Sequence, residues 1–142
     1  METRRQAHCA YCCMYHIVWI PRYRCKILVN NVQDYLMIKL KEVRKTYPEI
    51  EFIEQNIRPD HVHLVLSFPP KYSIAKVVQI LKQNTGKAMK DKFDFMKNLY
   101  KDQKGIWSVG YFVSTVGLDE KKILNYVKYQ GEEDSGQAKL EL

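Results

Sequence analysis

The spacing of apolar and polar residues divides the chain into four predicted strands and three predicted helices. Runs of aromatic and β-branched residues, or apolar residues that alternate with polar ones, indicate strands, and apolar residues three and four apart indicate amphipathic helices. The predicted strands are 11–20, 49–57, 61–67 and 111–115. The predicted helices are 32–47, a segment that follows an N-cap at Ser73, and about 119–131, with Asp119 as its cap.

This order of elements predicts an α+β fold. Its first six elements are strand, helix, strand, strand, helix and strand, with a charged, partly helical connection at 91–104, and they match a ferredoxin-like split βαβ sandwich. Such a fold has a four-stranded antiparallel sheet with helices on one face, and its first and third strands are central neighbours. The C-terminal helix is then an appendage, free to cross the sheet face or to reach a partner.

Length and the polar ends predict the domain organisation. A chain of 142 residues has room for one domain, which we expect at 11–131. Residues 1–10 are predicted as a flexible N-terminus and 132–142 as an acidic flexible tail. Because no apolar run reaches the ~18 residues that cross a bilayer, and the first residues do not resemble a signal peptide, we expect no membrane contact and a cytoplasmic location.

The charge of the chain narrows the class of partner. A formal net charge of +7 favours a polyanionic binding partner. A soluble basic protein that binds no polyanion would have the same charge, and this alternative stays open. Basic residues gather in 22–45 and 71–104, whereas the tail is acidic. Segregated charge of this kind fits a binding face better than a uniform solubilising charge does.

His61 and His63 are the most informative residues of the sequence. Residues two apart on a strand point to the same side, so the two imidazoles converge while Val62 points to the opposite face. That geometry suits a metal ion, and a solvated pair of histidines is the alternative. Asp60, directly before them, is either a further metal ligand or the residue that closes the preceding hairpin turn.

Tyr126 and Gln130 lie one helical turn apart on the last predicted helix. They share a face, which lets a phenol and an amide oxygen approach one ion or phosphate. Tyr129 and Glu133 have the same spacing, but they lie farther from the apolar stripe and fit a solvated face better. Lys122, one turn before Tyr126, could help the phenol to ionise.

These residue types support phosphoryl transfer on nucleic acid. Two imidazoles, an amide and water suit Mg²⁺ or Mn²⁺ and leave open positions for phosphate oxygens. An ion there would polarise a scissile phosphate and stabilise a departing 3′ oxygen, while Tyr126 attacks in line. The resulting phosphotyrosine can be reversed by a free 3′-hydroxyl, so strands are rejoined without a nucleotide cofactor.

The four cysteines lie in the first quarter of the chain: Cys9, Cys12, Cys13 and Cys25. This placement is unlike a disulfide framework for a whole secreted domain. The first two, with the adjacent His8, raise the question of a zinc site, but only Cys25 and His16 remain as further ligands, so small buried side chains are the preferred interpretation. Histidine-triad hydrolases and two-histidine phosphoesterases need motifs that this chain lacks.

Three segments carry a closer likeness to a known family. They are Tyr15-His-Ile-Val-Trp-Ile-Pro-Arg-Tyr-Arg24, Arg58-Pro-Asp-His-Val-His-Leu-Val65, and Gly110-Tyr-Phe-Val-Ser-Thr-Val-Gly117 followed by Tyr126-x-x-x-Gln130. In this order, across roughly 11–131, the set resembles the single-tyrosine HUH transposases of the insertion-sequence 200/605 group. The Cys9–Cys13 segment has no place in that family's pattern.

The resemblance implies an enzyme that cuts and rejoins single-stranded DNA at the hairpin-bearing ends of an insertion sequence through a 5′-phosphotyrosine. It implies that Tyr126 is the nucleophile, that His61 and His63 bind the metal ion, and that Gln130 is the third ligand. It also implies a homodimer in which the tyrosine helix of one subunit can complete the site of its partner, with Gly117 as the hinge before that helix.

Hairpin DNA is the partner that the resemblance implies, and six basic residues are candidate phosphate contacts: Arg22, Arg24, Lys26, Lys76, Lys82 and Lys122. Two alternatives stay open. One is a domesticated relative that acts on chromosomal repeat hairpins, and the other is a non-catalytic single-stranded nucleic-acid-binding module. The second fits less well, because the third strand offers histidines where an RNA-recognition sheet offers exposed aromatic rings.

Overall fold

The computed structural model describes residues 4–6, 9–11, 14–115 and 120–136, and its centre is a four-stranded antiparallel sheet. The sheet strands are β3 (Tyr15–Trp19), β4 (Glu51–Arg58), β5 (His61–Ser67) and β6 (Phe112–Ser114), in the order β4-β5-β3-β6. β3 and β5, the first and third strands predicted from the sequence, are therefore the central neighbours. The fold is the predicted ferredoxin-like α+β sandwich.

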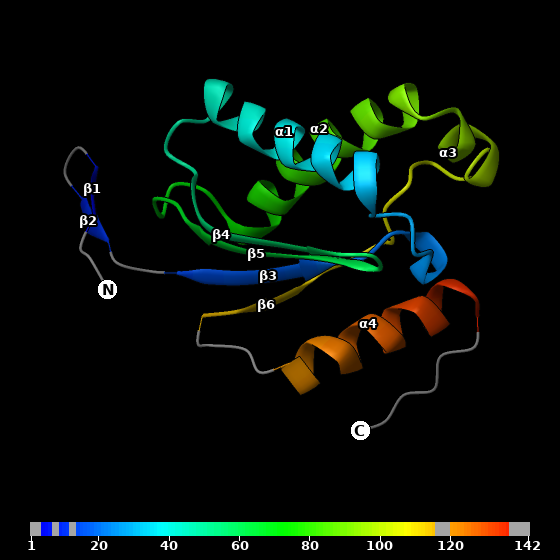
Figure 1. Ribbon diagram of the computed structural model, residues 1–142. Helices are drawn as coiled ribbons and strands as arrows, with labels where there is room; N and C mark the ends of the chain where they lie inside the picture. The colour runs from blue at the N-terminus through cyan, green and yellow to red at the C-terminus, as the bar shows by residue number, and fades with distance from the viewer. Residues whose placement is uncertain (1–3, 7–8, 12–13, 116–119, 137–142) are drawn as a thin grey trace.

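Helices cover both faces of this sheet (Figure 1). α1 (Asn30–Thr46) and α2 (Ile74–Lys92) lie on one face, and α4 (Glu120–Asp134) lies on the other. The helix side also carries the short α3 (Asp94–Leu99), and the 3-10 turn η1 (Arg22–Arg24) follows β3. The C-terminal helix thus makes a third layer.

The main core lies between the sheet and the α1–α2 pair. Ile17 and Trp19 from β3 and Leu64 from β5 are fully buried there, because alternate residues of both strands point to this face. Leu36 and Leu40 of α1 meet them with the four-residue spacing that the sequence indicated. The predicted cap of α2 is also confirmed, since Ser73 Oγ accepts a hydrogen bond from the Lys76 amide at 3.0 Å.

A smaller apolar cluster holds α4 on the opposite face. Val18 and Ile20 of the β3 segment pack against Ile123 and Val127 of α4, and all four are buried. Phe112 and Tyr126 border this cluster. The face of the sheet that carries the two histidines is therefore the one that α4 covers.

Several boundaries differ from those predicted. The predicted first strand, 11–20, is shorter in the structure, because Cys9–Tyr11 (β2) pairs with Arg4–Gln6 (β1) in a separate two-stranded sheet. Most of that sheet falls in 1–10, the predicted flexible N-terminus. α4 continues to Asp134, into the predicted acidic tail. Gly117, Asp119, Cys12 and Cys13 lie outside the described residues. Among the described residues, no helix is both long and apolar enough to cross a membrane.

Candidate active site

β5 presents His61 and His63 to the face covered by α4. Val18 of β3 pairs with His63, and Val62 and Leu64 point to the opposite core, so strand alternation places both imidazoles as predicted. His61 is buried, with 4% of its surface exposed, and His63 is half-buried. The pair is therefore not a solvated one.

Asp60 orients His61 through a charged hydrogen bond. Its Oδ1 accepts from His61 Nδ1 at 2.9 Å, and its Oδ2 accepts from Arg24 Nε at 2.9 Å. Burial alone would raise the pKa of Asp60, but the bonds from His61 and Arg24 outweigh it and hold the pKa below the usual 3.8. The carboxylate is thus ionised and engages the Nδ1 side of the His61 ring. Nε2 is the ring nitrogen that remains for a ligand.

A third histidine, His16, contacts His63. The Nδ1 atom of His16 lies 3.4 Å from Nε2 of His63, and the ring centroids are 5.7 Å apart. Burial lowers the pKa of His63, and the neighbouring imidazoles of His16 and His61 lower it further, so this ring is neutral at pH 7. The sequence indicates His16 as a zinc candidate, whereas its contact with His63 follows from the β3–β5 register, in which His16 pairs with Val65 and Val18 pairs with His63.

Tyr126 lies on the same face, but its hydroxyl is buried. Its ring centroid is 5.7 Å from that of Phe112, which belongs to the sheet row Phe112, Val18, His63. Two strand spacings, roughly 10 Å, separate Phe112 from His63 in that row. Burial raises the pKa of Tyr126, as does the negative charge of Asp134, and no described residue bonds to its hydroxyl. The phenol is neutral in this position.

Gln130, one helical turn after Tyr126, is engaged with other groups. It is buried, its Nε2 donates to Asp134 Oδ1 at 3.4 Å, and its Oε1 lies beside Gly110. The structure therefore groups His16, His61 and His63 and directs the Gln130 amide to Asp134 and Gly110. Among the described residues, no cluster of three histidine, cysteine or acidic side chains could hold a metal ion by itself.

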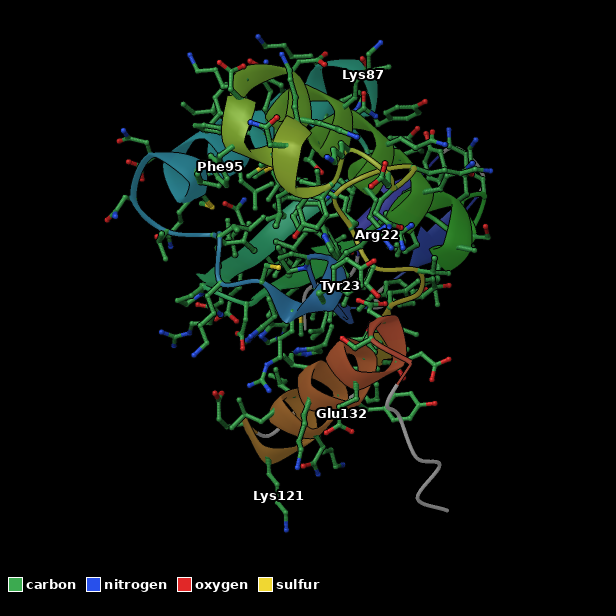
Figure 2. All side chains as sticks on the ribbon, turned by 90° about the vertical axis from the view of Figure 1, so that its right-hand side faces the viewer. Arg22, Tyr23, Lys87, Phe95, Lys121 and Glu132 are labelled. Atoms are coloured by element: carbon green, nitrogen blue, oxygen red, sulfur yellow. The ribbon has the colours of Figure 1, made fainter. Side chains whose placement is uncertain are left out.

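The C-terminal end of α4 is fastened to η1. The Asp134 carboxylate accepts from the Tyr23 amide at 2.9 Å and from Ser108 Oγ at 2.6 Å. Tyr23 has a left-handed backbone, with φ of 62°, a conformation that costs energy and that Asp134 helps to stabilise. Gly131 allows the close approach, because a Cβ there would lie 2.7 Å from the Arg24 Cβ. Figure 2 shows Tyr23 between the body of the protein and α4.

The predicted DNA contacts fall into two groups. Lys26, Lys76 and Lys122 are exposed. Arg24 is paired with Asp60, and Arg22 and Lys82 donate to backbone carbonyl groups.

Comparison with known proteins identifies the family. The model described as "Transposase IS200 like" matches residues 9–130. The transposase of insertion sequence element IS200 from Salmonella typhimurium is 30% identical, over 94% of this chain and 86% of that relative. The chain belongs to the IS200-like transposase family. As a member, it is a DNA-cleaving enzyme.

Solved structures support the fold of this transposase. A crystal structure of a putative transposase from Deinococcus radiodurans R1 matches with a TM-score of 0.73 and 24% identity, over 96% of this chain and 99% of that one. A REP-associated tyrosine transposase bound to a REP hairpin matches with a TM-score of 0.52 and 16% identity, over 97% and 76%. Both likenesses concern the architecture.

The donor set of this IS200-like transposase fits a divalent cation. His61 has its Nδ1 held by a carboxylate, which is the usual outer-shell arrangement of a metal-binding histidine. His63 is neutral, as a ligand must be. Both oxygens of Asp60 are already hydrogen-bonded, so the geometry favours an orienting role for Asp60 over a ligand role.

Proposed function

We propose that this transposase cleaves and rejoins single-stranded DNA at hairpin-bearing ends of an insertion sequence, with Tyr126 as the nucleophile. The observation that carries the proposal is the Arg24–Asp60–His61 chain beside neutral His63. This arrangement presents two imidazoles for a cation on the sheet face that also carries the tyrosine helix. His61 and His63 would bind Mg²⁺ or Mn²⁺, and the ion would supply Lewis-acid stabilisation of charge on the phosphate.

The reaction is a transesterification in which Tyr126 Oη attacks phosphorus. The bond from phosphorus to the 3′ oxygen breaks, the 3′ oxygen leaves as a hydroxyl, and the 5′ phosphate stays on the tyrosine. The phenol proton must leave Oη for this attack, which the buried position disfavours. The proposal therefore includes movement of α4 before reaction, either over its own sheet or onto a partner subunit. Gly117 is the proposed hinge, and Gln130 the proposed third ligand once the helix has moved.

A covalent adduct tests the proposal. The protein is incubated with Mg²⁺ or Mn²⁺ and a single-stranded oligonucleotide that carries the hairpin from the end of the insertion sequence. The products are then separated by gel electrophoresis in sodium dodecyl sulfate. We expect an adduct with the wild type that Tyr126→Phe abolishes and a chelator prevents. Tyr129→Phe is the matched control, because Tyr129 is one turn from Glu133 on the competing face and its loss should leave the adduct intact. An adduct that persists in Tyr126→Phe and disappears in Tyr129→Phe would contradict the assignment.

A domesticated relative that acts on chromosomal repeat hairpins is a second candidate. The structural likeness to a tyrosine transposase bound to a REP hairpin is the observation that favours it. The same adduct assay separates the two, with hairpins from the ends of the element in one series and dispersed repeat hairpins in the other. Adducts restricted to the repeats would favour the domesticated function.

A further inference from the structure

The turn η1 links α4 to the residue that orients His61. The Tyr23 amide donates to the Asp134 carboxylate, at the end of α4, at 2.9 Å. The next residue, Arg24, donates through Nε to Asp60 Oδ2 at 2.9 Å, and Asp60 Oδ1 contacts His61 Nδ1 at the same distance. A continuous path of hydrogen bonds and one peptide bond therefore leads from the tyrosine helix to the histidine site.

The side chain of Arg24 is held at both ends. Its aliphatic stem lies along α4 at Gly131, where a Cβ would come within 2.7 Å of the Arg24 Cβ and 3.2 Å of its Cδ. Its other end is the Nε group that donates to Asp60. Because only glycine leaves room for this stem, the docked position of α4 determines where Arg24 lies when it reaches Asp60.

The backbone of η1 has this arrangement only at a cost in energy. Tyr23 and Arg24 both have a left-handed backbone, with φ of 62° and 55°, a conformation that is unfavourable for residues other than glycine. Asp134 helps to offset this cost, because its carboxylate accepts a hydrogen bond from the Tyr23 amide. This bond is lost when α4 leaves, and the two residues are then free to adopt a more favourable conformation.

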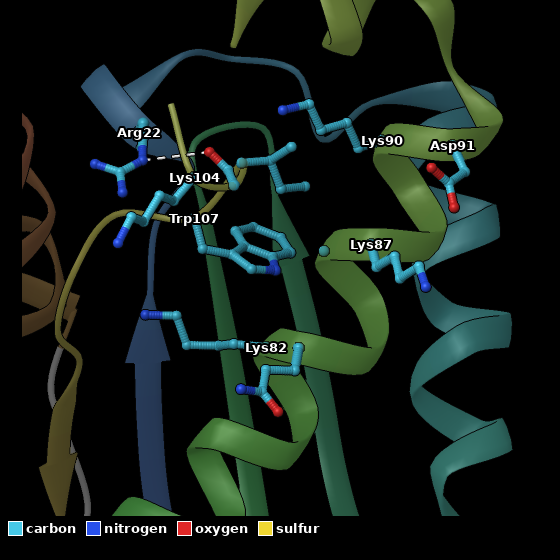
Figure 3. A pocket seen from close by; sticks show the side chains of 11 residues that line it. Arg22, Lys82, Lys87, Lys90, Asp91, Lys104 and Trp107 are labelled. Carbon is cyan, nitrogen blue, oxygen red and sulfur yellow. Dashed lines mark hydrogen bonds between the residues drawn. The ribbon is translucent and has the colours of Figure 1, made fainter. Parts of the chain in front are cut away.

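The first residue of η1 is fixed independently of α4. The Arg22 amide donates to the Ile106 carbonyl at 2.8 Å, and Arg22 Nε donates to the Gly105 carbonyl at 3.3 Å. Figure 3 shows the second of these bonds as a dashed line, beside Lys104 and Trp107. Movement of η1 is therefore restricted to the two residues that follow Arg22, which are the two residues on the path.

We infer that Arg24 is a positioning residue that couples the docking of α4 to the orientation of His61. The inference rests on the proposed function, because it takes His61 to be a metal ligand. With α4 docked, Arg24 holds Asp60 in place, and Asp60 holds the His61 ring so that Nε2 is available to a cation. When α4 moves to deliver Tyr126, Arg24 is released and this support weakens. Since coupling between two sites is reciprocal, binding of a cation at His61 also stabilises the docked helix.

A double-mutant cycle on Mn²⁺ affinity tests the inference. Mn²⁺ alone is titrated in the absence of DNA, and its binding is followed by electron paramagnetic resonance. Asp134→Ala should lower Mn²⁺ affinity about fivefold, although Asp134 acts on η1 and not on the histidines. Arg24→Gln should lower the affinity about tenfold. In the Arg24→Gln background, Asp134→Ala should change the affinity less than about twofold, because the residue through which it acts is already lost.

Two further variants separate coupling from general charge and from misfolding. Glu133→Gln removes the same charge from the exposed neighbour of Asp134 and should leave Mn²⁺ affinity within about twofold of the wild type. Arg24→Lys keeps a cation for Asp60 and should bind Mn²⁺ at least about threefold more tightly than Arg24→Gln. Equal losses in Asp134→Ala and Glu133→Gln, no rescue by Arg24→Lys, or an undiminished effect of Asp134→Ala in the Arg24→Gln background would each overturn the inference.

The His61 ring reports the coupling without a cation. In the metal-free protein, the imidazole nitrogen resonances of His61, measured by nuclear magnetic resonance, should shift in Asp134→Ala and in Arg24→Gln. The same resonances should stay unchanged in Glu133→Gln. Resonances of His61 that are identical in Asp134→Ala and in the wild type would also overturn the inference.

The adduct assay distinguishes failure of this inference from failure of the proposed function. A protein that forms the Tyr126 adduct, but in which the substitutions at Arg24 and Asp134 act additively on Mn²⁺ affinity, would refute the coupling and leave the proposed function standing. A protein whose His61 resonances shift in Asp134→Ala, but which never forms an adduct, would refute the proposed function and leave the coupling between α4 and His61 standing.

Discussion

The two faces of the sheet are built for different purposes. The α1–α2 face is covered by a continuous apolar core in which Trp19, Leu40 and Leu64 are fully buried. The α4 face has a small apolar cluster around Val18 and Val127, and beside it lie imidazoles, a buried phenol and a charged carboxylate. One face thus supplies most of the stability, and the other carries the polar groups of the candidate site.

This difference bears on the proposed role of α4, whose tyrosine must become available although the helix is docked on the sheet. Few apolar side chains fix α4, and its far end depends on the hydrogen bonds of Asp134 and on close packing at Gly131. We therefore expect α4 to detach at a lower cost than the unfolding of the remaining layers. The predictions below test that asymmetry.

The largest effect on the free energy of unfolding is expected from substitutions to alanine that leave cavities in the two apolar clusters. Leu64→Ala should lower the free energy of unfolding by about 2–5 kcal/mol, because Leu64 is fully buried in the main core. Ile123→Ala should cost less than about 2 kcal/mol, since α4 can detach instead of retaining the cavity. Urea denaturation followed by circular dichroism measures both. Equal losses in the two variants would show that α4 is as integral to the fold as the core.

The next effect concerns the carboxylate that orients His61. Asp60→Asn removes the charge that engages the Nδ1 side of the ring, so we expect Mn²⁺ affinity, measured by electron paramagnetic resonance, to fall about 10–100-fold. Glu42→Gln is the matched control, because Glu42 pairs with Lys39 within α1. Unchanged Mn²⁺ binding in Asp60→Asn would remove the basis for placing the cation beside His61.

A smaller effect is expected where α4 meets η1. Gly131→Ala would bring a Cβ to 2.7 Å from the Arg24 Cβ, a steric cost of about 1–3 kcal/mol that the higher helix propensity of alanine offsets by roughly 1 kcal/mol. Amide hydrogen exchange within α4 should therefore become faster, with little change in α1 and α2. Gly105→Ala, which meets no atom within 4 Å, is the control. Uniformly faster exchange would mean that α4 does not open independently.

Local patterns predicted much of this molecule. The alternation in β5 placed His61 and His63 on one face, the spacing in α1 identified Leu36 and Leu40, and Ser73 marked the start of α2. Each of these features depends on neighbours a few residues away, which a sequence displays directly. The strand order followed from the same elements.

Contacts between distant segments were not predictable in this way. Asp134 was assigned to a flexible tail, yet it bonds to Tyr23 and Ser108, far away in the sequence. His16 reaches His63 only through the β3–β5 register, and the depth of Tyr126 depends on how α4 docks. These contacts, and the burial of Tyr126, depend on tertiary packing. No pattern among neighbouring residues in the sequence indicates them.

The smallest effect is a pH dependence of the free energy of unfolding, which arises from Lys82 on α2. The pKa of Lys82 is lowered from 10.5 to about 8 in the folded protein. Between about pH 8 and 10.5, Lys82 therefore binds fewer protons in the folded state than in the unfolded state. Its contribution to the free energy of unfolding rises as the pH increases over this range. The difference in unfolding free energy between wild type and Lys82→Gln should therefore change in favour of the wild type over that range. Lys41→Gln, at an exposed site, should show no such trend. A flat difference for Lys82→Gln would mean that burial and the neighbouring charge of Arg22 do not lower the pKa of Lys82, and the contrast between the two faces would then rest on α4 alone.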